Sequence, residues 1–457
     1  MSTHSAALAF GERNESLSSL DELADGMAAK LQQHGVGSGQ RVALMSSNRP
    51  EFVIAVRAIW RVGAAAVVLS PAWKRNEVDH ALALTGPAFA VGDHPVLAGL
   101  MPMLHLDEPI SAGRGGFAAP PADADALLVF SSGTTGLPKA VRHTHRSFGA
   151  AIRHWRAALQ MTSSDRIQIV TPASHILGLL NIMTAVDAGA WVRMHPRFDI
   201  DQMLRHIQSD AITIEMAVAP IALALAAHPR LEDFDLTSLR YIMWCATPVT
   251  ASIAEAVTGR TGVTWLTAYG TTELPVIACC PLDDVRLDTV GRPVSGVSVR
   301  VSNDGEIQAR SESLMAGYLP DDANADVLCD GWYRTGDIGD VDADGFLRIT
   351  DRTKEMIKVR GFQVAPAEIE AVLHGHPAVK DCAVYGIPDA ENGEAIVAAV
   401  ATRADVTPGE LTGLVSERLA SYKRLAEVVF VSYIPRLPSG KVLRRVLKES
   451  HGCASDK

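Results

Sequence analysis

The chain has 457 residues, of which 47% are apolar and 21% charged, and its formal net charge is −10 at pH 7. These values predict a globular protein of roughly two to four domains with sizeable cores. The acidic balance and the lack of a dense Lys/Arg block argue against nucleic-acid binding, and the sequence predicts neither a signal peptide nor a membrane span.

The cysteines are dispersed and have no C-x-x-C spacing. In a chain of this length they indicate reduced thiols in a cytoplasmic protein, not a disulfide framework or a zinc site. The six are Cys245, Cys279, Cys280, Cys329, Cys382 and Cys453.

The first two-thirds of the chain alternates helix-like and strand-like patterns. Ser19-Leu20-Asp21-Glu22 has the pattern of a capping box and predicts an amphipathic helix that ends near Gly35. Strands separated by helix-length segments are typical of parallel sheets with βαβ crossovers. The expected strands are 42–45, 65–69, 126–130, 167–170, 211–218, 239–243 and 263–266, with a helix at about 50–62.

In the last third of the chain, the pattern of predicted secondary structure changes twice. Short strands at 297–301, 306–309 and 346–349, with a hairpin turn at Asp344-Gly345, predict a β-rich subdomain over about 290–350. The remaining residues predict an α+β segment, with helices at about 366–374 and 408–419 and strands at 383–385 and 396–402. We therefore expect an α/β protein: a large N-terminal domain, residues 1–353, followed through a short hinge by a smaller C-terminal domain, residues 354–457.

A loop rich in hydroxyls and glycines follows the apolar run 126–130. It reads Ser-Ser-Gly-Thr-Thr-Gly-Leu-Pro-Lys over residues 131–139. Glycines let backbone N–H groups approach a phosphate, hydroxyls donate to its oxygens, and a lysine neutralises it. The loop lacks the Gly-Lys-Ser/Thr of a Walker A motif, and Pro138 favours extended backbone before it. Composition alone also fits a plain surface turn.

Three further segments carry groups suited to a nucleotide. Tyr269 and Glu273 follow a strand-like run, and ligands bind at strand ends in open α/β sheets. Tyr269 could stack on a base, and Glu273 could hold Mg²⁺ beside phosphates. Asp337 follows a glycine turn and suits ribose hydroxyls. Lys441 follows Gly440 and could deliver a point charge to a reacting phosphate. Each segment alone also fits a solvated turn or a basic tail.

Together with the charged segment 351–361, these segments resemble, in their order, the adenylate-forming superfamily of acyl-CoA synthetases, non-ribosomal-peptide adenylation domains and luciferases. The resemblance extends from about residue 17 to 447. It implies that Lys441, Thr272, Glu273 and His175 are catalytic and that Glu273 binds the metal. The implied nucleotide-binding residues are Ser131, Ser132, Gly133, Thr134, Thr135, Gly136, Lys139, Ala246, Thr247, Tyr269, Asp337 and Arg352.

The same resemblance implies an acyl pocket beside the segment 172–178, which has the superfamily's Pro-x-x-His-x-x-Gly pattern. Trp244 and Cys245 are bulkier than the small residues common there, which favours a compact pocket, although packing of Trp244 in the core is an equally good interpretation. No acid near His175 could bind an α-amino group, so a fatty, alicyclic or aromatic carboxylic acid is expected. The implied pocket residues are His175, Ile176, Leu179, Met243, Trp244 and Cys245.

The implied activity is that of an AMP-forming acyl-CoA synthetase that uses ATP, Mg²⁺ and coenzyme A. Lys358 and Gly361 would serve the thioester step after the C-terminal domain turns about Lys354. The main alternative is an acyl-AMP ligase that loads an acyl carrier protein. A non-catalytic binding relative and a luciferase-like oxygenase are weaker alternatives, and the sequence leaves monomer and dimer equally open.

Overall fold

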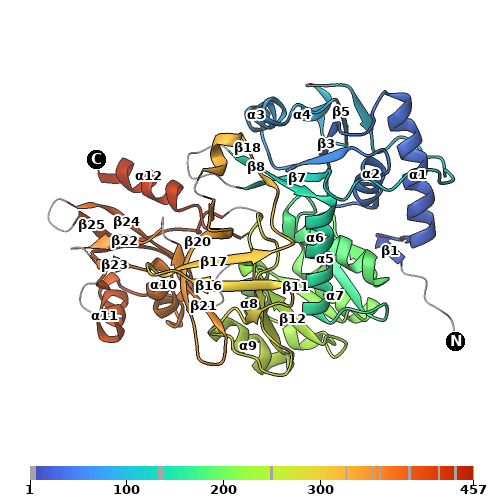
Figure 1. Cartoon of the computed structure of the whole chain (residues 1–457). Coiled ribbons are helices and arrows are strands. Elements are labelled where there is room, and N and C mark those ends of the chain that lie inside the picture. The colour runs from blue at the N-terminus through green and yellow to red at the C-terminus, as the bar shows by residue number, and fades with distance from the viewer. Residues whose placement is uncertain are drawn as a thin grey trace.

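The computed structural model describes residues 7–131, 138–246, 251–325, 327–352, 355–359, 362–389, 393–419, 423–436 and 440–455. Two large sheets and their helices form one end of the molecule. A smaller β-sheet lies next to them, and the C-terminal α+β part lies beyond it at the other end (Figure 1). This arrangement confirms the predicted α/β fold class.

The first large sheet has seven strands in the order β18-β8-β7-β4-β3-β5-β6. Its central pairs are parallel, whereas β8 pairs antiparallel with both β7 and β18. The phosphate-type loop therefore connects two antiparallel strands and does not lead into a helix. The strands are β3 (Arg41–Met45), β4 (Ala65–Leu69), β5 (Phe89–Gly92), β6 (Met103–His105), β7 (Asp125–Ser131), β8 (Lys139–Thr144) and β18 (Gly317–Leu319).

The second large sheet has nine strands in the order β15-β14-β13-β12-β11-β9-β10-β1-β2. Its central strands are parallel, as the sequence predicts. They are β1 (Ala7–Phe10), β2 (Arg13–Ser16), β9 (Arg166–Ile169), β10 (Trp191–Met194), β11 (Ile214–Ala217), β12 (Tyr241–Trp244), β13 (Trp265–Tyr269), β14 (Ala278–Cys279) and β15 (Arg292–Pro293).

Helices separate the two sheets and cover their outer faces. One apolar core contains side chains of both sheets and of α1, α2, α5 and α6, while α7, α8 and α9 cover the outer face of the nine-stranded sheet. In addition, α3 and α4 cover the outer face of the seven-stranded sheet. The helices are α1 (Leu17–Gln33), α2 (Pro50–Arg61), α3 (Arg75–Thr85), α4 (Pro95–Ala98), α5 (His145–Leu159), α6 (Ile176–Ala188), α7 (Ile200–Asp210), α8 (Ala219–Ala227) and α9 (Ala251–Thr261).

The predicted capping box at the start of α1 is wrong. The cap is Ser16, whose hydroxyl accepts from the N–H of Ser19 at 3.0 Å, so Ser19 lies in the first turn. Ser16 is also the last residue of β2, and its backbone is extended, as an N-cap requires. Strand pairing therefore sets the point at which the helix begins.

The third sheet contains the predicted short strands. They are β16 (Val297–Val301), β17 (Glu306–Ser311), β19 (Leu328–Cys329), β20 (Trp332–Val341) and β21 (Leu347–Arg352). The expected hairpin turn lies between β20 and β21, where Gly345 has φ +85° and donates its N–H to the Asp342 carbonyl. This sheet matters for the site because β20 carries Asp337.

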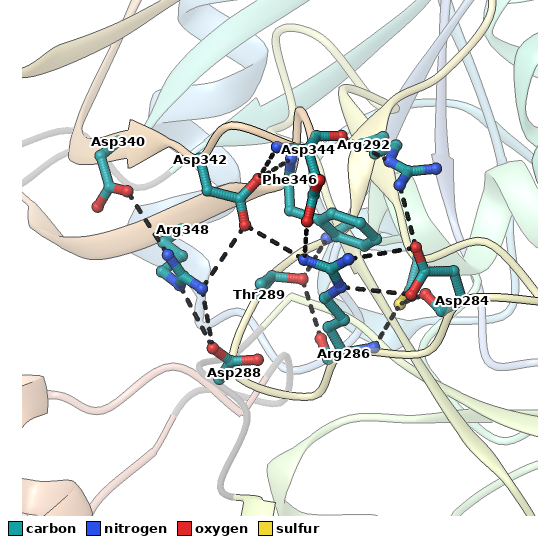
Figure 2. Close-up of polar contacts among 12 residues, drawn as sticks. Asp284, Arg286, Asp288, Thr289, Arg292, Asp340, Asp342, Asp344, Phe346 and Arg348 are labelled. Atoms are coloured by element: carbon teal, nitrogen blue, oxygen red, sulfur yellow. Dashed lines mark hydrogen bonds and ion pairs between the residues drawn. The ribbon is translucent and has the colours of Figure 1, made fainter.

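A cluster of ionic and ring contacts fixes the β20–β21 hairpin to the loop before β15 (Figure 2). Phe346 is fully buried, and the guanidinium carbons of Arg286 and Arg292 lie 4.1 and 4.3 Å from its ring centre. Arg286 also pairs with Asp344 at 2.9 Å, and Arg292 with Asp284 at 3.0 Å. The aromatic ring and the carboxylates together orient both arginines.

Replacement of Phe346 by alanine should destabilise the protein by about 3–5 kcal/mol, because a buried ring is lost and two guanidinium groups lose their aromatic face. Denaturant unfolding measures the change. Phe198→Ala is the control, since Phe198 is 39% exposed and the same truncation should cost much less there. Equal losses in the two variants would contradict the importance of this cluster.

The C-terminal part has its own sheet and its own apolar clusters, which contain residues from within 355–457 only. Helices α10 and α11 agree with the predicted helices to within one residue. The elements are β22 (Ile357–Val359), β23 (Phe362–Val364), β24 (Val379–Asp389), β25 (Gly393–Thr402), β26 (Glu427–Phe430), α10 (Pro366–His374), α11 (Pro408–Arg418) and α12 (Arg444–Ser455). In the described part of the chain, no helix is long and apolar enough to cross a membrane.

Candidate active site

A cavity of about 700 Å³ lies where the two large sheets, the third sheet and the C-terminal part meet. It brings together residues that are far apart in the sequence, from Ser131 to Lys441. The predicted site residues that line it are Ser131, Lys139, His175, Ile176, Cys245, Ala246, Tyr269, Thr272, Glu273 and Lys441.

The segment after β13 forms one wall of the cavity. Gly270 is required there, because a Cβ at this position would lie 2.1 Å from the Pro275 carbonyl oxygen. The Thr271 hydroxyl accepts from the N–H of Leu274 at 3.0 Å, and the Thr272 carbonyl is 2.8 Å from Nε2 of the buried His143. This tight turn directs Thr272 and Glu273 toward the cavity.

Asp337 lies beside Tyr269, although the two residues come from different sheets. The Tyr269 hydroxyl donates to Asp337 Oδ2 at 2.5 Å, and Asp337 is only 2% exposed. The turn before Asp337 is fixed by Glu306, which accepts from the Gly336 N–H at 3.1 Å. Arg352 pairs opposite Asp337 in the β20–β21 ladder. An aromatic ring and an acid therefore meet, as an adenosine site needs.

Glu273 is 8% exposed, and its Oε1 accepts from the Tyr318 hydroxyl at 2.8 Å. Within the described part of the chain, its second oxygen, Oε2, accepts no hydrogen bond. The Lys139 ammonium lies 5.2 Å from the centre of the Tyr318 ring. Among the described residues no group of three or more His, Cys, Asp or Glu could hold a metal. One carboxylate is nevertheless sufficient for Mg²⁺, which takes most of its other ligands from water and substrate phosphates.

His175 is the N-cap of α6, and its Nδ1 accepts from the N–H of Leu177 at 3.3 Å. Gly178 allows the tight approach of this turn, because a Cβ there would lie 2.2 Å from the Pro172 carbonyl oxygen. Burial lowers the pKa of His175 to about 4, so the imidazole is neutral at neutral pH. The Asn48 side chain fixes the preceding segment, since it donates to the Thr171 carbonyl at 2.9 Å.

Lys441 reaches the cavity from the C-terminal part. It follows Gly440, which has φ +86° and whose carbonyl accepts from Arg436 at 2.8 Å. Arg436 is itself paired with Asp381 on β24 at 2.8 Å. The turn that presents Lys441 is therefore attached to the sheet of the C-terminal part, so movement of that part would move the lysine with it.

The structure corrects part of the predicted acyl pocket. Ile176 and Cys245 line the cavity, whereas Leu179, Met243 and Trp244 are buried in the cores and do not. Alternation along β12 directs Met243 into the core between the sheets and Trp244 toward the outer helices. The Trp244 ring packs against Trp265, with their centres 5.4 Å apart.

Trp155, Leu177 and Leu180 are apolar residues that do line the cavity. Trp155 is 2% exposed, and its indole N–H donates to Asn181 Oδ1 at 2.7 Å, which fixes the ring orientation. Trp155, Asn48 and Tyr318 are not predicted from the sequence. An apolar helix face carrying a tryptophan does not distinguish a pocket wall from a core.

Several predicted residues lie outside the described residues: Ser132, Gly133, Thr134, Thr135, Gly136, Thr247, Lys354 and Gly361. Arg352 and Lys358 belong to β21 and β22, and only their backbone is described. The roles predicted for these residues stay predictions.

Comparison with known proteins decides the family. Residues 2–319 match the family model for the AMP-binding enzyme, and residues 368–441 match the model for the AMP-binding enzyme C-terminal domain. The chain belongs to the AMP-binding enzyme family. This confirms the predicted adenylate-forming superfamily and the predicted enzyme class, an AMP-forming ligase that joins an acid to a thiol.

Relatives of this family member match it over nearly their whole length. A Mycobacterium tuberculosis 3-[(3aS,4S,7aS)-7a-methyl-1,5-dioxo-octahydro-1H-inden-4-yl]propanoyl:CoA ligase is 35% identical, over 98% of this chain and 96% of the relative. The 4-coumarate–CoA ligase 5 of Oryza sativa subsp. japonica is 34% identical, over 97% and 91%. The structure of o-succinylbenzoate CoA synthetase from Bacillus subtilis with its acyl-adenylate intermediate has a TM-score of 0.89 and 29% identity, over 98% and 96%.

Proposed function

We propose that this enzyme activates a medium-sized, ring-bearing carboxylic acid with ATP and Mg²⁺ and transfers the acyl group to coenzyme A. The observation that carries the proposal is the cavity itself. Its lining includes groups suited to phosphate, metal and adenine, such as Lys139, Glu273 and Tyr269, together with the apolar side chains of Trp155, Ile176, Leu177 and Leu180. The CoA-ligase activities of the relatives support the same reaction.

The polar end would bind the nucleotide. Tyr269 would stack on the adenine, and Asp337 would accept from the ribose hydroxyls. Lys139 would neutralise phosphate, and Glu273 would hold Mg²⁺ through its available oxygen. When bound, the metal supplies charge stabilisation for the phosphates. Positioning and charge are the main requirements, because phosphoryl transfer needs little covalent help from a protein.

His175 would orient the acid. Because its Nδ1 accepts a backbone hydrogen bond, the proton of the neutral ring is on Nε2. An Nε2–H donor at the cavity wall can bind one oxygen of the substrate carboxylate and leave the other oxygen available for attack. His175 lies next to Ile176 and Leu177, so the acyl chain would extend toward Trp155.

Two steps follow. A carboxylate oxygen attacks the α-phosphorus of ATP, the bond to the β-phosphate bridging oxygen breaks, and pyrophosphate leaves, with Lys441 beside the developing charge. The CoA thiolate then attacks the acyl carbon, the bond to the AMP oxygen breaks, and AMP leaves. We propose that the C-terminal domain, residues 354–457, turns about Lys354 between the steps and exchanges Lys441 for the face that carries Lys358 and Gly361.

The apolar end supports a compact, ring-bearing acid. Trp155 lines the cavity, and its ring would offer a flat face for an aromatic or alicyclic group. No charged side chain is among Trp155, Ile176, Leu177, Leu180 and Cys245, which line it. The relatives named above act on acids that also contain rings.

Trp155→Ala should shift selectivity toward larger acids, because it removes the ring that closes the cavity. We expect the ratio of kcat/KM for a large acid to that for a small one to rise roughly tenfold or more, since apolar contacts of this size discriminate by about 1–3 kcal/mol. Trp155→Phe should give an intermediate ratio and is the safer variant, because alanine at a buried tryptophan also destabilises the fold.

Trp244→Phe is the matched control. Trp244 is equally buried but faces the outer helices, so its replacement should leave the selectivity ratio unchanged. A selectivity ratio that changes in Trp244→Phe but not in the Trp155 variants would contradict the proposal. It would mean that the acyl group lies on the side of β12 that faces the outer helices.

A panel of carboxylic acids tests the proposed function. Pyrophosphate release is measured with each acid, with and without CoA, and the thioester is quantified. Ring-bearing acids should give CoA-dependent thioester. Release without thioester would point to the alternative acceptor, a carrier-protein phosphopantetheine, and no release with any acid would contradict the proposal.

We further propose that the enzyme works in the cytoplasm, in keeping with its free cysteines.

A further inference from the structure

Tyr318 touches two groups of the proposed phosphate and metal site and was not predicted from the sequence. Its hydroxyl donates to Glu273 Oε1 at 2.8 Å, and its ring lies 5.2 Å from the Lys139 ammonium. Glu273 follows β13 and Lys139 begins β8, so the tyrosine connects two segments that belong to different sheets. It also lines the cavity.

The backbone of Tyr318 is fixed on both sides. In the β18–β8 ladder it pairs opposite Val141, two residues beyond Lys139. Its N–H donates to Asn324 Oδ1 at 2.7 Å, and its carbonyl accepts from Asn324 Nδ2 at 3.1 Å. Gly317 allows this approach, because a Cβ there would lie 2.9 Å from Asn324 Oδ1.

The same short segment also fixes the backbone of Glu273. The N–H of Met315 donates to the Glu273 carbonyl at 2.8 Å, and the N–H of Ala316 donates to the Arg142 carbonyl at 2.7 Å. Residues 315–318 thus contact Glu273 through both its backbone and its side chain. Oε1 of this carboxylate is thus held by the Tyr318 hydroxyl, while Oε2 accepts no hydrogen bond among the described residues.

We propose that Tyr318 is a positioning residue that orients the Glu273 carboxylate for Mg²⁺ through its hydroxyl and the Lys139 ammonium for the phosphates through its ring. The proposal rests on the proposed function, in which Glu273 holds the metal. A tyrosine hydroxyl is a hydrogen-bond donor at neutral pH, so it can hold Glu273 Oε1 while Oε2 takes the metal. Partners of metal-binding carboxylates commonly control metal affinity in this way.

Mn²⁺ binding in the presence of ATP tests the role proposed for the Tyr318 hydroxyl. Electron paramagnetic resonance measures free Mn²⁺ without acid or CoA, so the result does not depend on the unidentified acid. Tyr318→Phe keeps the ring and should weaken Mn²⁺ binding roughly tenfold or more, while ATP binding without metal stays unchanged. Tyr318→Ala should weaken Mn²⁺ binding to the same extent and also weaken metal-free ATP binding, because Lys139 loses the ring.

Two comparisons separate positioning from general damage. Tyr241→Phe removes a buried hydroxyl that donates to the Leu159 carbonyl at 2.7 Å and not to Glu273, so Mn²⁺ affinity should stay within about twofold. In Glu273→Gln the metal carboxylate is lost, so adding Tyr318→Phe should cause no further loss of Mn²⁺ affinity.

Unchanged Mn²⁺ affinity in Tyr318→Phe, or an equal loss in Tyr241→Phe, would overturn the proposal for Tyr318. A Glu273→Gln variant with normal Mn²⁺ affinity would instead contradict the metal role of Glu273 in the proposed function. The two failures are therefore distinguishable.

Discussion

Lys441→Ala should reduce adenylate formation by roughly 100- to 1,000-fold, the loss typical when one preorganised cationic or hydrogen-bonding group is removed from a developing charge. Lys441 is the lysine that the C-terminal part contributes to the cavity lining. Attack of a carboxylate on a phosphate brings two negative groups together, and a cation between them is most valuable in the transition state. The loss should therefore appear in kcat as well as in kcat/KM.

The same variant should retain most of its thioester formation from a supplied acyl-adenylate, because Lys441 would leave the site before that step. Pyrophosphate exchange measures the first half-reaction, and thioester formation from synthetic acyl-adenylate and CoA measures the second. Lys448→Ala is the control, since Lys448 is exposed on α12. Equal loss in both half-reactions of Lys441→Ala would argue against the proposed exchange of faces.

Asp337→Ala should weaken ATP and AMP binding by roughly 100-fold or more. Two ribose hydroxyls would lose a charged acceptor, and hydrogen bonds to charged groups contribute roughly 1.5–3 kcal/mol each. The Tyr269 hydroxyl would also lose its partner at 2.5 Å, so the ring expected under the adenine would be less well oriented. Both effects concern nucleotide binding only. The affinity for the carboxylic acid, measured without nucleotide or metal, should therefore stay unchanged.

Isothermal titration calorimetry with AMP measures this loss. Asp340→Ala removes the same charge from the same strand, but Asp340 is on the exposed stretch of β20 and pairs with Arg348 at a distant 3.9 Å. Its AMP affinity should match that of the unaltered protein. Similar weakening in both variants would mean that net charge, and not the position of Asp337, governs nucleotide binding.

Much of the site could be predicted from sequence because its chemistry is local. Residues 131–139, 269–273 and 440–441 each combine glycine with hydroxyl or charged residues in a short turn. The residue types and their order in such a turn determine which groups it can bind, so the turn can be recognised from the sequence alone. The structure places Ser131, Lys139, residues 269–273 and Lys441 around one cavity.

The errors and omissions have a common physical origin. Trp244 was expected in the acyl pocket, but β12 is buried on both faces, so its sequence does not reveal which side faces the cavity. Trp155 looks like a core residue because it is 2% exposed and lies on the apolar face of α5. The start of α1 was misplaced because Ser16 and Ser19 are both good caps, and pairing of β2 chose between them.

The sequence by itself determined the reaction class, through short segments whose glycines, hydroxyls, acids and lysines are suited to nucleotide phosphates wherever they lie. Only the tertiary structure decided which apolar side chains line the cavity and which residue donates to the Glu273 carboxylate. Trp155 and Tyr318 contact residues that are distant in the chain, and the roles proposed for them come from the partners Asn181, Glu273 and Lys139. Long-range contacts of that kind arise from packing of the sheets against one another, and no local pattern encodes them.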